Sequence, residues 1–225
     1  MLNQSHYPEY LVKNWEPLFP KQGGHHSRFA IKRNMDTHKD WLIAIGGIAL
    51  VLVVQMLTMA AMGRHAICQC GYLKLWHGVL RSVDTSQHLF DWYSFTHVLH
   101  GFIFYFILRV VFPKLSLAYS LLAAFALEGL WEVLENSQYA IEYYRSGAVV
   151  TDKFGDTMVN SFTDTIVIFV GFYMAYKLPV WTSIAFVIFI EIMLAAFAQG
   201  NLTILFLRMM SELFALLGFG TSNYR

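Results

Sequence analysis

The sequence contains few charged residues, and this shortage excludes an ordinary soluble domain. Asp, Glu, Lys and Arg make up 14% of the 225 residues, whereas hydrophobic residues make up 56%. A soluble domain carries about 25% charged residues, so this chain cannot cover itself with polar side chains in water. The composition therefore predicts a multi-pass membrane protein whose immediate partner is membrane lipid.

The chain also lacks an excess of charge of one sign. Its formal net charge at pH 7 is +1, whereas a nucleic-acid-binding protein usually presents a strongly basic surface. Nucleic acid is therefore excluded as a partner. The first forty residues hold six Lys or Arg residues and three prolines but no apolar run like that of a signal peptide. We expect no signal peptide and an irregular tail over residues 1–40.

Apolar runs long enough to cross a bilayer follow this tail. A spanning helix needs about 20 consecutive apolar residues, and five segments meet this length. They are residues 41–62, 93–112, 115–134, 157–176 and 180–199. A sixth run, residues 202–219, is interrupted by Arg208 and Glu212, so it either spans the membrane or lies in the interface. The sequence predicts an all-α membrane protein, with five or six transmembrane helices in one domain over residues 41–219 and a short tail at 220–225.

The distribution of Lys and Arg predicts how this bundle is oriented. Cytoplasmic flanks of spanning helices are enriched in basic residues, and the tail before the first span carries six of them. We therefore expect a cytoplasmic N-terminus. The two long connections, residues 63–92 and 136–156, then form a structured loop region on the outer side.

Ionisable residues of the predicted spans gather at this outer end. They are His97 and His100 in the second span, Glu128, Glu132 and Glu135 in the third, and Asp156, Asn160 and Asp164 at the start of the fourth. Within each span, spacings of three, four, seven or eight residues put them on one helical face. Asp84, His88 and Asp91 repeat this spacing in the preceding connection, which predicts a short interfacial helix. Since an unpaired charge in hydrocarbon is unfavourable, we expect these faces to point at one another.

Imidazoles and carboxylates at this depth predict a metal-dependent catalytic site. The mixture suits a divalent metal such as zinc, manganese or iron. The predicted metal ligands are His97, His100 and Asp164. The predicted catalytic residues are Glu128 and Glu132, one of which would act as general base, and Asn160, which would donate a hydrogen bond to the substrate. Further candidates are Asp84, His88, Asp91, Glu135 and Asp156.

Three functions stay open, because no fixed signature such as H-E-x-x-H occurs. The first is hydrolysis or group transfer on a lipid-linked or envelope substrate at the outer leaflet, favoured because intramembrane charges are usually functional. The second is a proton- or cation-coupled carrier with the carboxylates as a relay, disfavoured because nothing comparable continues into the cytoplasmic halves. The third is an envelope assembly factor whose polar residues only lock the helices in register.

The chain has two cysteines, Cys68 and Cys70, in the first long connection. An outer compartment permits disulfides, but a bridge between residues two apart is geometrically unfavourable. Free thiols or a contact to a soft metal therefore compete with the bridge, and a structural role is favoured.

Several segments together resemble a known family. They are CQCGYLKLWHG, DTSQHLFDWYSFTHVLHGF, EGLWEVLENS, GDTMVNSFTDT and QGNLT. In this order they are similar to the motifs of uncharacterised protein family 0314, a domain-of-unknown-function family of proteobacterial multi-pass membrane proteins. The likeness runs from about residue 63 to residue 205. It implies a location in the bacterial cell inner membrane and brings no reaction with it.

Overall fold

The computed structural model describes residues 37–79, 82–146, 155–198 and 203. Five long helices dominate it: α2 (His38–Ala61), α3 (Ser94–Val111), α4 (Leu117–Glu135), α6 (Met158–Lys177) and α7 (Val180–Phe197). All five are long and apolar enough to cross a membrane. This confirms the predicted all-α membrane bundle. The segment predicted as a sixth span, apart from Thr203, the tail at 220–225 and residues 1–36 lie outside the described residues.

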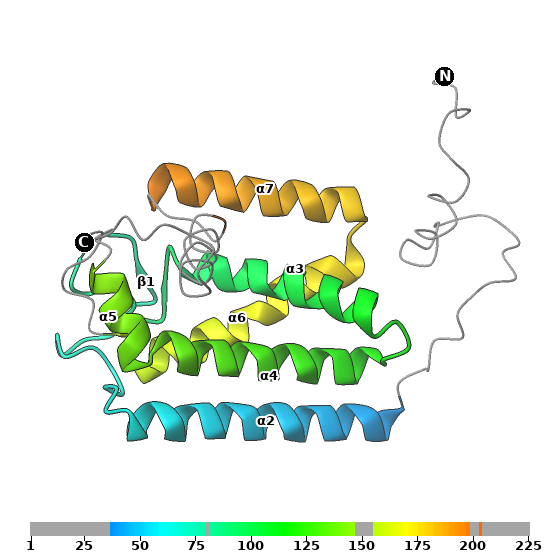
Figure 1. The fold of residues 1–225 in the computed structure, drawn as a ribbon, viewed down its shortest axis with the longest axis horizontal. Helices are drawn as coiled ribbons and strands as arrows, with labels where there is room; N and C mark the ends of the chain where they lie inside the picture. The colour runs from blue at the N-terminus through cyan, green and yellow to red at the C-terminus, as the bar shows by residue number, and fades with distance from the viewer. Residues whose placement is uncertain (1–36, 80–81, 147–154, 199–202, 204–225) are drawn as a thin grey trace, which may run out of the picture.

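Polar side chains set the starts of three helices. Thr37 caps α2, because its hydroxyl accepts from Asp40 N while the Asp40 carboxylate accepts from Thr37 N at 2.8 Å. Ser116 and Thr157 cap α4 and α6, each accepting from the backbone N–H three residues further on. A proline lies in each of the short connections α3–α4 and α6–α7 and prevents the helix from continuing. Both pairs of helices therefore run in opposite directions (Figure 1).

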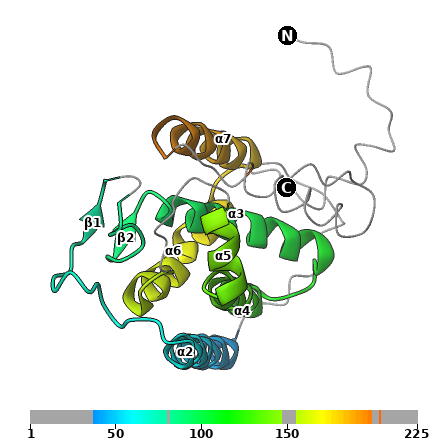
Figure 2. The ribbon, with the colours of Figure 1, turned by 60° about the vertical axis from the view of Figure 1, so that its left-hand side comes forward.

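The helices pack around a central group of three. α2 lies along α4, α3 and α6 cross in the middle, and α7 lies on α3 (Figure 1). The view turned by 60° shows α2 and α7 on opposite flanks of α3, α4 and α6 (Figure 2). The flanking helices expose large apolar side chains, such as Leu50 of α2 and Ile192 of α7, each 63% exposed. Such outward apolar faces are what a bilayer requires.

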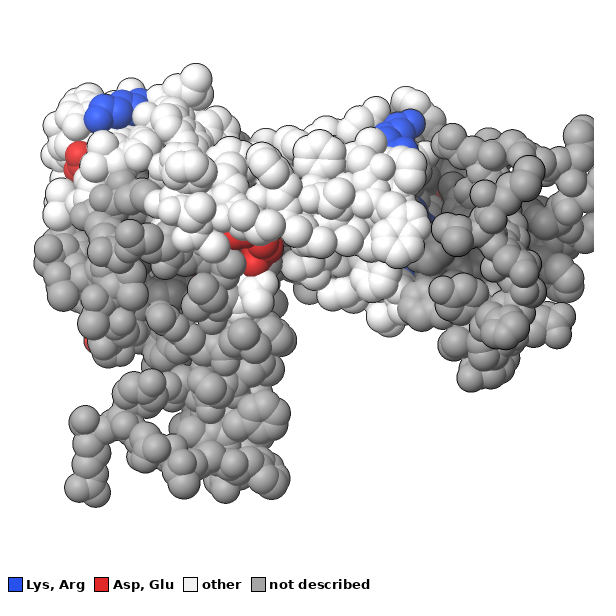
Figure 3. Space-filling view, turned by 90° about the horizontal axis from the view of Figure 1, so that it is seen from above, with Lys and Arg blue, Asp and Glu red and all other residues white. Residues whose placement is uncertain are grey.

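The surface along the helices carries few charges. Figure 3 shows the described part of one face as mostly uncharged, with Lys and Arg side chains near its two ends and one acidic patch between them. A long surface with few charges between basic ends suits a protein that spans the bilayer and keeps its cations in the interfaces.

α3 and α6 touch through two glycines. A Cβ at Gly101 would lie 2.2 Å from Ile168 O, and a Cβ at Gly171 would lie 1.9 Å from Val98 O. The two backbones therefore meet where only glycine fits, which is a common way for membrane helices to pack closely. This contact lies directly beside His97 and fixes the first turns of α3 against α6.

Short elements lie at one end of the bundle, called here the loop end and formed by the described residues 62–79, 82–93, 136–146 and 155–157. They are β1 (Trp76–His77), β2 (Phe90–Asp91) and α5 (Gln138–Ser146). β1 and β2 pair in parallel, with Trp76 opposite Phe90. Helix α5 lies inside the second long connection, which was expected to be structured but for which no helix was predicted.

The short helix predicted through Asp84, His88 and Asp91 is wrong. This segment is a turn in which Ser86 has a φ of 60°. The Asp91 carboxylate accepts from Ser86 N and from Tyr93 N, both at 2.7 Å. These two bonds satisfy backbone donors that a helix would have used otherwise, so they favour the turn.

Candidate functional site

Three helices bring imidazole and carboxylate side chains together at the loop end. α3 supplies His97 and His100, α4 supplies Glu128 and Glu132, and α6 supplies Asp164. We call these five residues the His–carboxylate centre. All five are buried, and Glu128 is fully enclosed at 0% exposure. The expectation that the charged faces of these helices point at one another therefore holds for these residues.

Glu128 contacts both histidines. Its Oε1 lies 2.5 Å from His97 Nδ1, and its Oε2 lies 2.9 Å from His100 Nδ1. An ionised carboxylate can only accept, so both Nδ1 atoms donate their hydrogen to it. In a neutral ring the lone pair is then at Nε2. Glu128 thereby orients both rings as carboxylates orient metal-binding histidines in other proteins.

His97 belongs to two groups of possible metal ligands. Its Nδ1 lies 3.3 Å from Glu132 Oε1, and its Nε2 lies 3.8 Å from Asp164 Oδ2. One ligand atom from each of His97, Glu132 and Asp164 lies within 4.8 Å of the others, and the same holds for His97, His100 and Glu128. Both groups have the donor types that zinc, manganese and iron accept. The predicted ligands His97, His100 and Asp164 therefore lie close together. His100 belongs to one group, Asp164 belongs to the other, and His97 belongs to both.

The centre requires positive charge. Glu128, Glu132 and Asp164 carry three negative charges when ionised, and two protonated imidazoles would balance only two of them. A buried charge without a partner is destabilising by several kcal/mol. A bound cation or retained protons would supply the balance. The arrangement therefore favours the binding of a cation or the handling of protons.

Aromatic side chains pack against the centre at His100, and an apolar cluster lies beyond it. The His100 ring lies 5.3 Å, centroid to centroid, from Trp131 and 5.6 Å from Phe104. Further along the helices, a buried cluster that includes Phe125 and Ile168 fills the interior. The centre therefore lies where the polar loop end meets an apolar interior.

Two of the further predicted residues make contacts around α4 at the loop end. Asn136 Nδ2 donates to Asp156 Oδ2 at 2.8 Å, and Asp156 N donates back to Asn136 Oδ1 at 2.7 Å. Glu135 Oε2 accepts from Trp131 Nε1 at 2.8 Å. Neither Glu135 nor Asp156 belongs to the two ligand groups that share His97.

The remaining predicted residues lie in or against the first long connection. Asn160 Nδ2 donates to Leu89 O at 3.4 Å, and the Tyr72 hydroxyl donates to Asp84 Oδ2 at 3.4 Å. His88 is only 1% exposed. Burial lowers the pKa of His88, and the nearby His77 and Lys74 lower it further. These residues organise the loop rather than the His–carboxylate centre, and the role of Asn160 toward a substrate stays a prediction.

Gln55 of α2 is a buried polar residue that the sequence analysis missed. Its Nε2 donates to Ser161 Oγ at 2.8 Å, and its Oε1 accepts from Thr165 Oγ1 at 2.9 Å. Ser161 and Thr165 lie on either side of Asp164 along α6, so Gln55 ties α2 to the helix that carries this carboxylate. The sequence feature that could have revealed this role is the amide side chain of Gln55 inside the apolar run 41–62.

The fold and the buried residues define a multi-pass membrane protein with a histidine–carboxylate centre between its helices. The family profile described as "Protein of unknown function (DUF2585)" matches residues 59–218, which include all five residues of the centre. The chain belongs to this family, and its relatives carry the name UPF0314 protein. The resemblance found in the sequence motifs is confirmed.

The relatives come from several proteobacteria. A UPF0314 protein of Brucella anthropi is 42% identical over 154 residues, which cover 68% of this chain and 78% of the relative. One of Paracoccus denitrificans is 44% identical over 142 residues, covering 63% and 74%. One of Sphingopyxis alaskensis is 38% identical over 176 residues, covering 78% and 92%. No solved structure matches this chain significantly.

Proposed function

We propose that the protein is a metal-dependent hydrolase or group transferase that acts on a lipid-linked or envelope substrate. The observation that carries the proposal is the position of His97, which two groups of possible metal ligands from three helices share. A polar contact between membrane helices contributes only about 0.6 kcal/mol on average. Helix locking alone is therefore a weak reason to bury five ionisable groups, whereas intramembrane charges commonly mark functional sites.

The residues of the centre have separable roles in this proposal. His97, Glu132 and Asp164 would hold a divalent cation, which supplies Lewis acidity and a bound water of lowered pKa. Glu128 accepts the Nδ1–H of both histidines and so leaves Nε2 of His97 available as a ligand. His100, oriented by the same carboxylate, would accept a proton from the attacking group.

An apolar groove beside the centre supports a substrate with a hydrocarbon chain. The groove has a volume of about 390 Å³, within the range of small-molecule sites. It is lined by Leu75, Trp76, Phe90, Ser94, Phe95, Val98 and Val167. Ser94 and Val98 flank His97 on α3, and Val167 lies one turn from Asp164 on α6. A lipid chain in this groove would bring the attached polar group next to the His–carboxylate centre.

The interior beyond the centre favours an enzyme over a carrier. A relay for protons or cations needs polar groups along the whole path across the membrane. Beyond the centre, however, α3, α4 and α6 pack through an apolar cluster that includes Leu108, Phe125 and Phe172. This cluster supports chemistry at one face of the membrane rather than transport through it.

We also propose that the loop end faces outward from the bacterial inner membrane and that the N-terminus is cytoplasmic. The support is the concentration of Lys and Arg in the tail before α2. Reporter fusions after residue 40 and after residue 147 should give opposite topology signals. The same signal at both positions would refute this orientation.

The metal content of the detergent-purified protein tests the proposed function. The wild type should hold a stoichiometric transition metal. His97→Gln and Asp164→Asn should lose it while keeping a cooperative thermal melt, because each removes a ligand and nearly preserves side-chain volume. Glu135→Gln is the matched control, since Glu135 lies on the same helix as Glu132 and outside both ligand groups. It should keep its metal.

Activity is tested separately with lipid extracts. The wild-type protein, incubated with a total envelope lipid extract, should convert at least one lipid species in mass spectra, and Asp164→Asn should not. A wild type without metal, or His97→Gln and Asp164→Asn variants with full metal content, would contradict the metal site. Conversion that persists unchanged in Asp164→Asn would contradict the catalytic role.

A further inference from the structure

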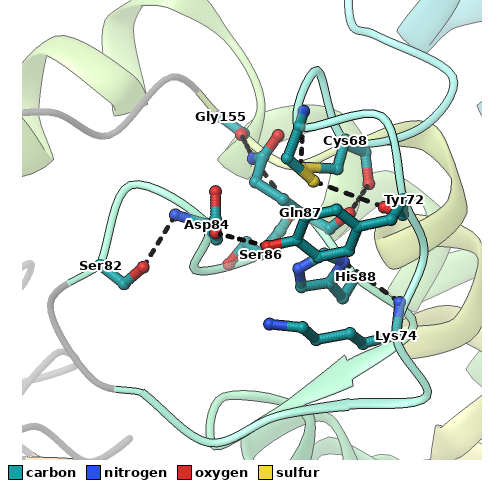
Figure 4. The surroundings of a disulfide bond; sticks show 11 residues. Cys68, Tyr72, Lys74, Ser82, Asp84, Ser86, Gln87, His88 and Gly155 are labelled. Carbon is teal, nitrogen blue, oxygen red and sulfur yellow. Dashed lines mark hydrogen bonds between the residues drawn. A yellow bond between two sulfur atoms is a disulfide. The ribbon is translucent and has the colours of Figure 1, made fainter.

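A third group of possible metal ligands lies in the loop, apart from the two groups of the His–carboxylate centre. Cys68 and Cys70 are joined by a disulfide. Their sulfur atoms and one ring nitrogen of His88 all lie within 4.8 Å of one another. Figure 4 shows Cys68, Tyr72 and His88 on the same side of the loop, with the Tyr72 ring stacked on His88 at a centroid distance of 5.3 Å.

Two buried imidazoles in this part of the loop have unused nitrogen atoms. His77 and His88 are 4% and 1% exposed, and their ring centroids lie 5.2 Å apart. Within the described residues, Nε2 of His88 and both ring nitrogens of His77 have no hydrogen-bond partner. Lys74 N reaches His88 Nδ1 at 3.4 Å, which is long for a hydrogen bond. Buried polar atoms are normally satisfied, so this cluster indicates a ligand that the protein atoms do not supply.

The loop is held in place before any ligand binds. Thr157 N donates to Ser86 O at 3.0 Å, and Gln87 Nε2 donates to Gly155 O at 2.8 Å. These bonds fix the segment before His88 to the start of α6. Leu89 N donates to Lys74 O at 3.1 Å, which joins the residue after His88 to the segment that leads into β1 and His77. A ligand site on this scaffold would need little reorganisation.

We propose that Cys68, Cys70 and His88 form a binding site for a thiophilic divalent cation such as Zn²⁺ when the two cysteines are reduced, and that the disulfide is the metal-free state. Two thiolates and an imidazole are typical ligands of Zn²⁺. Cations that prefer oxygen ligands, such as Mg²⁺ and Ca²⁺, do not favour this set. His77 is the nearest further nitrogen donor and a candidate for the fourth position.

The disulfide form and the metal-bound form interconvert in two steps, reduction and metal binding. A dithiol reductant reduces the Cys68–Cys70 disulfide by exchange, becoming a disulfide itself while the protein gains two electrons and two protons as two thiols. The cation then binds and both thiol protons leave, so the sulfur atoms bind as thiolates. Oxidation by a disulfide partner reverses the sequence and releases the cation. The site would therefore couple metal binding to the redox state of the loop.

Cobalt is a suitable probe, because Co²⁺ bound to thiolates gives an intense near-ultraviolet charge-transfer band that nitrogen and oxygen ligands do not give. The full-length protein in detergent is reduced with a phosphine, freed of reductant without air and titrated with Co²⁺. The reduced wild type should develop the band at one equivalent and lose it when Zn²⁺ is added. The oxidised wild type should not develop it. Since Co²⁺ in the His–carboxylate centre lacks this band, the result is independent of the proposed function.

Variants identify the ligands. Cys68→Ser with Cys70→Ser should abolish the band, and His88→Gln should weaken Co²⁺ binding at least tenfold. Ser82→Ala is the matched control from the same loop and should bind as the wild type does. Zn²⁺ should also protect both thiols of the reduced wild type from alkylation, a measurement that needs no variant. The proposal is overturned by a reduced wild type without the band, by thiols that Zn²⁺ leaves unprotected, or by a folded His88→Gln variant with unchanged affinity.

Discussion

Substitution of Gly171 by alanine tests how the contact of α3 with α6 builds the His–carboxylate centre. A Cβ at this position would lie 1.9 Å from Val98 O and 3.2 Å from Phe102 N. Carbon–oxygen contacts between packed helices are normally about 3.3 to 3.6 Å, so the new methyl group is about 1.4 Å too close. The obstacle is backbone, which cannot rotate away as a side chain can, and the helices must separate.

The expected loss of stability follows from two opposing terms. Overpacking of this kind typically destabilises by about 1 to 3 kcal/mol, and the better helix propensity of alanine offsets at most about 1 kcal/mol. Because the obstacle is backbone, we expect a cost in the upper part of the overpacking range, about 2 to 3 kcal/mol, and hence a net loss of about 1 to 2 kcal/mol. Because Val98 adjoins His97, separation of the helices should also lengthen the 3.8 Å distance between His97 Nε2 and Asp164 Oδ2. Metal content should therefore fall even below the temperature of unfolding.

The assay is a thermal melt in detergent combined with metal analysis, with Gly46→Ala as control. Gly46 lies in α2, and a Cβ there would have nothing within 4 Å. The same substitution at Gly46 should be neutral or slightly stabilising and should leave the metal in place. A Gly171→Ala variant with wild-type stability and metal content would refute the reasoning. Equal destabilisation by both variants would also refute it, because the effect would then not arise from the α3–α6 contact.

Two further predictions concern contacts around the centre. Gln55→Leu removes the hydrogen bonds between α2 and α6 and should lower stability by about 0.6 to 1.7 kcal/mol in a thermal or denaturant melt. Unchanged stability would mean that these bonds do not hold α2 against α6. Asn136→Ala removes both hydrogen bonds to Asp156 and should lower stability by about 1 to 3 kcal/mol. It should also accelerate limited proteolysis of the loop end, whereas Tyr139→Phe, at a position that is 75% exposed, should not. Equal cleavage rates in both variants would contradict the role of the Asn136–Asp156 pair.

The sequence was sufficient to predict the centre where charged residues at helical spacing lie inside a long apolar run. His97, Glu128, Glu132 and Asp164 lie inside apolar runs, so helical geometry could be assumed and the spacing of charges gave the buried face. The same spacing failed for Asp84, His88 and Asp91, because no apolar run requires a helix there. In that segment the Asp91 carboxylate accepts from two backbone N–H groups and holds a turn.

Other features depend on contacts that no local pattern specifies. The close contact of α3 with α6 at Gly101 and Gly171 is visible only once the two helices are placed together. A glycine in a membrane helix does not by itself show which helix it will contact. The parallel pairing of Trp76 with Phe90 and the reciprocal bonds of Asn136 with Asp156 join residues 14 and 20 positions apart. The role of Gln55 likewise required knowledge of which helix faces α2.

The most direct test of the account is the X-ray absorption spectrum of the metal bound to the oxidised, detergent-purified protein. With Cys68 and Cys70 joined in the disulfide, the metal should be confined to the His–carboxylate centre. The spectrum should then show only nitrogen and oxygen ligands, including the scattering pattern of imidazole, and the signal should vanish in Asp164→Asn. Sulfur ligands at about 2.3 Å, or the lack of a stoichiometric metal, would contradict the claim that the buried histidines and carboxylates bind it.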